Sequence, residues 1–131
     1  MVSIFFGFLY AVLSIVFGAF IHHALKDKLS VTDLTTLQTA SKYLYYNAIP
    51  LIILFFTQKN WKWPNKISVC FAIFGGLFSG SLILLVFTNI KWFAYLTPIG
   101  GLGLMLTWLM WLVVIYKRNK GKVSVMSVSN Y

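Results

Sequence analysis

The stretch ISVCFAIFGGLFSGSLILLVFTNI, residues 67–90, decides the fold because it runs for twenty-four residues without a charged side chain. At about 1.5 Å rise per residue, a helix over this stretch is roughly 36 Å long, enough to cross a bilayer core of about 30 Å. Small residues gather in its middle, where Gly76 and Gly80 form a GxxxG pattern that encloses Ser79. Lipid gives helices no hydrophobic reason to pair, so small residues that permit close backbone contact favour association. We therefore expect a central span over residues 67–89, with neighbouring helices packed on its small-residue face.

The composition of the whole chain is that of an integral membrane protein. Its 131 residues are 60% hydrophobic and 10% charged, and the mean hydropathy is +0.83. A soluble domain carries about 25% charged residues, so a soluble fold is excluded. The net charge of +9 is explained by lysines in loops that face anionic lipid, and no nucleic-acid binding is expected. The length predicts one domain, residues 1–131, with four transmembrane helices in a compact all-α bundle.

Two of the other spans precede the central one. The first is expected over residues 4–25, where small residues including Gly18 recur at three- and four-residue spacing. The second helix is expected to begin outside the membrane as an amphipathic segment capped by Ser30. It then crosses the membrane over residues 43–58, and Pro50 inside it should remove a backbone hydrogen bond and kink the helix.

The fourth span is expected over residues 97–116. Threonine followed by proline is typical of a helix start, so Thr97-Pro98 should open this helix. Gly100 and Gly101 thin its first turns and are expected to pack against a neighbouring helix. The tail, residues 117–131, is basic and then polar, without a packing pattern.

The distribution of lysine and arginine predicts the orientation. With four spans, seven of these residues lie on the side of both termini and four lie on the opposite side. The positive-inside rule then places both termini in the cytoplasm. The sequence therefore predicts a multi-pass protein of the cell (inner) membrane.

Several short motifs resemble those of a known family. They are GAFIHHAL at residues 18–25, QTA at residues 38–40, Tyr43 with Tyr46-Asn47-Ala48, LFSGSL at residues 77–82 and TPIGG at residues 97–101. This set, over roughly residues 7–115, resembles the small four-span membrane proteins called domain of unknown function four-two-three. The resemblance implies architecture and location, and no established activity. Ile21 and Asn47 depart from it, standing where the motifs have glycine and usually histidine, so a two-histidine metal or haem site would be half lost.

Polar residues of the expected spans suggest a pocket that binds a ligand in the outer third of the membrane. Its candidate residues are His23, Tyr43, Asn47, Ser81 and Thr97. Tyr43 and Asn47 are four residues apart and share a helix face. The expected helix start next to Thr97 would add backbone N–H groups, which attract anions.

Each of these residues also has a plainer explanation. His22 and His23 are adjacent and point about 100° apart, so both could simply be interfacial residues that end the first span. The polar side chains of Asn47, Ser79 and Ser81 could serve simply to form hydrogen bonds between helices. Each such bond stabilises a membrane protein by about 0.6 kcal/mol on average. One histidine with one asparagine is a poor metal site, so no metal and no cofactor is expected. His23 is instead expected to hydrogen-bond to the second or fourth span.

The sequence carries no signature of catalysis. No acid lies in any expected span, which argues against a proton-coupled pump, and no HExxH, Walker or GxSxG motif is present. We therefore expect no enzyme and no catalytic residue. The favoured function is that of an accessory protein or a binder of lipid or a small amphiphile, with membrane lipid and a membrane-protein partner or a second copy as partners. The alternative is a small transporter subunit acting as a dimer, followed by an enzyme or metal carrier that uses His23.

Overall fold

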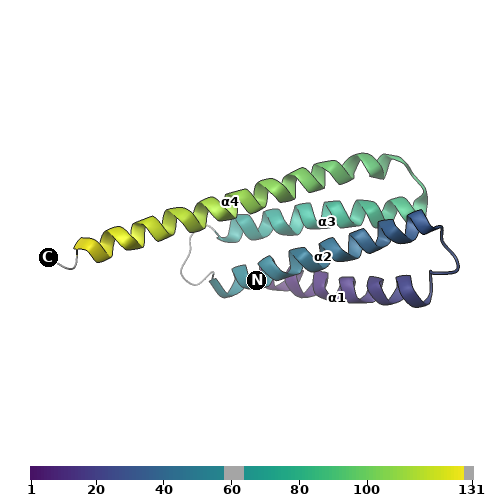
Figure 1. Ribbon diagram of the computed structural model, residues 1–131, viewed down its shortest axis with the longest axis horizontal. Helices are drawn as coiled ribbons and strands as arrows, with labels where there is room; N and C mark the ends of the chain where they lie inside the picture. The colour runs from purple at the N-terminus through teal and green to yellow at the C-terminus, as the bar shows by residue number, and fades with distance from the viewer. Residues whose placement is uncertain (58–63, 129–131) are drawn as a thin grey trace.

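The computed structural model of the chain describes residues 1–57 and 64–128, and its regular structure there consists of four helices. They are α1 (Val2–His23), α2 (Val31–Thr57), α3 (Pro64–Thr88) and α4 (Trp92–Val128). The helices run up and down in sequence order, and α4 extends past the other three toward the C-terminus (Figure 1). The expected all-α four-helix bundle is confirmed.

Three of the helices have the length and apolarity of membrane spans: α1, α3 over Asn65–Thr88 and α4 over Trp92–Asn119. Only 22% to 33% of the most apolar window of each is buried inside the bundle, so most of their apolar side chains point outward. Such a surface requires a lipid environment. The helix α2 is less apolar, because Lys42 and Asn47 interrupt its hydrophobic run, but it packs against both α1 and α3.

The start of α2 is capped as its sequence predicts. The hydroxyl of Ser30 accepts a hydrogen bond from the backbone N–H of Asp33 at 3.1 Å and donates one to the Asp33 carboxylate at 2.6 Å. The first half of α2 is not separate from the bundle, however. Leu37 is fully buried in a cluster with Ile21 of α1 and Val86 of α3. The amphipathic beginning of this helix therefore packs beside the ends of its neighbours, because its apolar stripe has somewhere to be buried.

The helix α4 begins earlier and ends later than expected. Asn89, with a positive φ of 55°, ends α3, and its backbone N–H donates to the Leu85 carbonyl at 2.9 Å. A short turn follows and α4 starts at Trp92, so the expected helix start at Thr97-Pro98 is wrong. Pro98 therefore lies inside α4, where its missing N–H leaves the carbonyl of Ala94 without its usual helical donor. The helix also continues beyond residue 117 to Val128.

Glycines bring α4 against α3. An ideal Cβ at Gly100 would lie 2.7 Å from the backbone nitrogen of Phe78, and one at Gly103 would lie 2.2 Å from the ring of Phe74. Gly101 is less crowded, since its ideal Cβ would lie 3.4 Å from the ring of Phe78. The contribution of Gly100 to packing was expected, whereas that of Gly103 was not.

The GxxxG pattern of α3 packs through one of its two glycines. An ideal Cβ at Gly76 would lie 2.7 Å from the hydroxyl of Tyr10 in α1, and this hydroxyl donates a hydrogen bond to the Ala72 carbonyl. Among the described residues, no atom beyond the nearby backbone of its own helix lies within 4 Å of an ideal Cβ at Gly80, so the expectation that Gly80 packs is not met. Gly80 lies four residues after Gly76, so its position on the helix is rotated by about 40° relative to that of Gly76. At this position none of the described side chains of α1 reaches the surface of α3.

The remaining small residues expected to pack lie inside the bundle or at its edge. Ser79 is fully buried, and its hydroxyl has no hydrogen-bond partner among the described residues. Gly18 lies against α2, with its ideal Cβ 3.8 Å from the hydroxyl oxygen of Ser41. Gly7 belongs to the same small-residue stripe of α1 as Gly18, and its ideal Cβ would lie 2.8 Å from the side chain of Ile52, so it marks the close approach of α1 to α2.

Candidate functional site: a groove between α2 and α4

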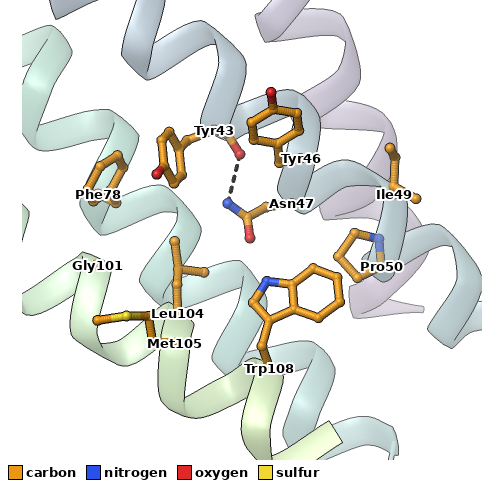
Figure 2. Close-up of a pocket in the computed structure, with 10 residues that line it drawn as sticks. All are labelled: Tyr43, Tyr46, Asn47, Ile49, Pro50, Phe78, Gly101, Leu104, Met105 and Trp108. Atoms are coloured by element: carbon orange, nitrogen blue, oxygen red, sulfur yellow. Dashed lines mark hydrogen bonds between the residues drawn. The ribbon is translucent and has the colours of Figure 1, made fainter. Parts of the chain in front are cut away.

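A groove of about 530 Å³ lies between α2 and α4, with α3 behind it (Figure 2). It is lined by Tyr43, Tyr46, Asn47, Ile49, Pro50, Phe78, Gly101, Leu104, Met105 and Trp108. Most of this lining is apolar or aromatic. Several lining side chains are also exposed on the surface of the bundle, so the groove opens sideways toward lipid.

The packing order of the helices creates this groove. In the described part of the chain, α2 packs extensively on α1 and α3, whereas α4 packs extensively on α3 alone. The two helices on either side of α3 therefore diverge from each other instead of meeting. Gly101 has no side chain to fill the gap, and the ring of Phe78 is the part of α3 that lies behind it.

Asn47 is the buried polar group of the groove. Its side chain is only 2% exposed, and its Nδ2 donates a hydrogen bond to the Tyr43 carbonyl at 2.7 Å. No described residue donates a hydrogen bond to its Oδ1, and Figure 2 shows this oxygen pointing into the groove on the side of Trp108. The indole nitrogen of Trp108 lies at the edge of its ring nearest Asn47. An acceptor and a donor thus face the same space.

A second acceptor belongs to the backbone of the same helix. Pro50 lies inside α2 and has no N–H, so the carbonyl of Tyr46, four residues earlier, lacks its usual helical donor. Both residues line the groove. The proline expected to free a carbonyl therefore lies beside the asparagine.

The groove lies at mid-depth in the bundle and not in its outer third. An ideal Cβ at Gly75 would lie 3.2 Å from Asn47, and Gly75 is about 17 Å from the start of α3 and about 20 Å from its end by the helix rise. The ring of Tyr43 lies 4.4 Å, centroid to centroid, from that of Phe78. Because the first half of α2 also packs in the bundle, Asn47 lies near the middle of the packed helices and not near their ends.

Two other candidate residues form a separate contact. Ser81 of α3 and Thr97 of α4 are hydrogen-bonded at 2.8 Å, and the Ser81 hydroxyl also lies 2.9 Å from the carbonyl of Phe78. Neither side chain lines the groove. Their arrangement fits the plainer explanation, a hydrogen bond between neighbouring helices.

His23 lies at the end of α1 and is exposed, as is His22. Within the described residues, His23 makes no hydrogen bond to α2 or α4, so the expected bond is not found. Ile21 occupies the buried position of this turn at 2% exposure, and two residues further a helix has rotated by about 200°. His23 therefore points to the opposite side. Among the described residues, no three His, Cys, Asp or Glu side chains gather as a metal site would require.

Sequence reasoning missed the contribution of α4 to the groove. Leu104, Met105 and Trp108 come from this helix. Tryptophan in membrane helices is enriched at the interfaces, whereas Trp108 lies in the interior of an apolar span. This unusual position could have indicated that α4 contributes to a site. Part of that signal has a packing explanation, since the ring of Trp108 meets that of Phe71 edge-on at 5.1 Å.

Comparison with known proteins agrees with this architecture. The family model described as "Protein of unknown function (DUF423)" matches residues 17–101. The chain is 34% identical over 117 residues to a UPF0382 membrane protein of Staphylococcus aureus, which covers 85% of this chain and 92% of that protein. It is 31% identical to the UPF0382 membrane protein YwdK of Bacillus subtilis, covering 88% of this chain and 97% of the relative.

The name of a third relative specifies the inner membrane. The UPF0382 inner membrane protein YgdD of Escherichia coli is 29% identical over 118 residues, covering 88% of this chain and 87% of that protein. No solved structure matches the chain. Long apolar helices and these relatives together identify a multi-pass membrane protein, and the chain belongs to the family described as "Protein of unknown function (DUF423)".

Proposed function

We propose that this protein is a non-enzymatic protein of the cell membrane that binds a lipid or another small amphiphile in the groove between α2 and α4. The observation that carries the proposal is the oxygen of Asn47, which belongs to a side chain only 2% exposed, has no donor among the described residues and points into an apolar groove. Ligand sites are mostly apolar clefts of about 300–1,000 Å³ in which a few polar groups fix orientation. A volume of about 530 Å³ lies within that range.

The opening of the groove supports a ligand that enters from the bilayer. Tyr46, Ile49 and Met105 line it and are exposed on the apolar surface of the bundle at 55%, 44% and 58%. An amphiphile dissolved in the membrane could reach this site without crossing water. A water-soluble ligand would first have to enter the hydrocarbon region, which is unfavourable for polar molecules.

Native mass spectrometry from mild detergent tests the proposal. The wild type should carry a lipid or amphiphile adduct, and Gly101→Leu should lose it because the leucine side chain fills the groove. Gly80→Leu is the matched control, since it adds the same side chain to α3 at a position where no neighbouring side chain or helix of the described structure lies within 4 Å of an ideal Cβ. Identical adducts on both variants would refute binding in this groove, and a dimer in the same spectra would favour the alternative of a transporter subunit.

We also propose that both termini lie in the cytoplasm. The positive-inside rule supports this orientation, with seven lysines and arginines on the side of the termini and four on the other. An up-and-down bundle of four helices has both ends of the chain on one side, as the arrangement in Figure 1 illustrates. The name of the Escherichia coli relative supports the inner membrane as the location.

A further inference from the structure

We propose that the occupant of the groove is a neutral amphiphile with a hydroxyl group, and that this hydroxyl binds between Asn47 and Trp108. The hydroxyl would donate a hydrogen bond to Oδ1 of Asn47 and accept one from the indole N–H of Trp108. This inference rests on the proposed function and adds the chemical class of the ligand to it.

The two protein groups define what the ligand must offer. The Asn47 oxygen is an acceptor in a side chain that is 2% exposed, and none of the described residues supplies its donor. The indole of Trp108 is a donor only. A hydroxyl group is both donor and acceptor, so one oxygen atom can serve both protein groups. An ether or ketone could accept from Trp108 but would leave Asn47 without a donor.

The depth of the groove selects a neutral ligand. Asn47 packs against Gly75, near the middle of α3, so a ligand at Asn47 lies close to the centre of the hydrocarbon region. No charged side chain of the described residues lines the groove to neutralise a phosphate, a carboxylate or an ammonium group. An uncompensated charge at this depth is strongly unfavourable, whereas a hydroxyl with two hydrogen bonds is tolerated.

The rest of the lining accommodates the apolar part of such a molecule. Phe78 and Leu104 also line the groove, and Ile49 and Met105 line it with exposed side chains. A hydrocarbon chain anchored by its hydroxyl can therefore leave the groove between α2 and α4 and continue in lipid. The geometry thus favours long-chain or polyprenyl alcohols and other neutral hydroxylated lipids over intact phospholipids, whose charged headgroups belong at the interface.

A pair of photoreactive probes tests the hydroxyl directly. The full-length protein in phosphatidylcholine nanodiscs is irradiated with a long-chain alcohol that carries a diazirine, or with the methyl ether of the same molecule. Intact mass gives the labelled fraction, and peptide mapping gives the labelled helix. We expect the alcohol to label peptides of α2 and α4 at about tenfold lower concentration than the ether, the factor that one hydrogen bond contributes in a site shielded from water.

Variants assign the effect to the polar pair. Asn47→Leu should bring labelling by the alcohol down to the level of the ether and leave the ether unchanged. Trp108→Phe should reduce the preference for the alcohol part of the way. Ser79→Ala is the control, because Ser79 is a buried polar residue of α3 that does not line the groove, and it should keep the full preference.

The outcomes separate this inference from the proposed function. Equal labelling of the groove by alcohol and ether in the wild type would overturn the hydroxyl inference and leave amphiphile binding in place. An alcohol preference that persists in Asn47→Leu would overturn the role assigned to Asn47. Absence of both probes from the groove peptides would overturn the inference together with the proposed function.

Discussion

Replacing Gly100 by alanine should loosen the contact between α3 and α4. An ideal Cβ at this position would lie 2.7 Å from the backbone nitrogen of Phe78 and 2.8 Å from its Cα. Backbone atoms cannot rotate away as a side chain can, so the two helices must separate by several tenths of an ångström. The rings of Phe74 and Phe78, which pack against the neighbouring glycines of α4, would move with the backbone of α3.

The expected magnitude follows from two opposing effects. Overpacking a well-packed contact costs about 1–3 kcal/mol. Alanine also stabilises a helix by about 1 kcal/mol relative to glycine, so the net loss at Gly100 should be about 0–2 kcal/mol. At Gly80 no neighbouring helix of the described part of the chain comes within 4 Å of the added methyl group, so only the helical gain should remain. The helical gain is common to both variants, so they should differ by the overpacking cost of about 1–3 kcal/mol in the free energy of unfolding.

Reversible unfolding in mixed detergent micelles, followed by circular dichroism, measures this difference. Gly100→Ala should unfold at a lower denaturing-detergent fraction than wild type, and Gly80→Ala at an equal or higher one. Gly103→Ala is a useful third variant, because its added methyl group meets the ring of Phe74, which can move, and its loss should be smaller than the distance of 2.2 Å suggests. Equal stability of Gly100→Ala and Gly80→Ala would refute the close approach of α4 to α3.

Three further predictions concern other contacts and the orientation. Ser41→Ala removes a hydroxyl that donates to an α1 carbonyl at 2.9 Å and should lower the free energy of unfolding by about 0.6 kcal/mol in the same assay, where no change would show that this bond is not stabilising. Ser30→Ala removes the cap of α2 and should cost about 1 kcal/mol, while Ser30→Asp should restore most of it; a neutral alanine variant would contradict the cap. Cysteine at Asn89, exposed between α3 and α4, should react with a membrane-impermeant thiol reagent in intact cells, and cysteine at Asn119 should not. The wild type, whose Cys70 lies in α3, gives the background, and the reverse labelling pattern would invert the orientation.

The membrane helices could be predicted from local sequence. A backbone in lipid has to satisfy its own hydrogen bonds, so a long uncharged segment such as residues 67–90 has little choice but to be helical. The beginning of α2 could also be predicted from local sequence, because the cap requires only the Ser30 side chain and the backbone N–H of Asp33. The predicted start of α4 was wrong because it also rested on local sequence alone. A threonine and a proline describe a plausible local start, but they do not exclude a helix that begins one turn and a half earlier at Trp92.

Which residues meet was decided by the tertiary structure. The GxxxG pattern showed that α3 could pack closely, yet only the arrangement of α1 determined that Gly76 meets Tyr10, whereas none of the described neighbouring helices reaches Gly80. The same holds for the candidate site. Tyr43 and Asn47 share a helix face by their spacing, whereas Trp108 joins them because α2 and α4 both pack on α3 without filling the space between them. A sequence fixes the face that each helix can offer, but the rotation and distance between helices arise from packing over the whole bundle, and these determine where a groove can form.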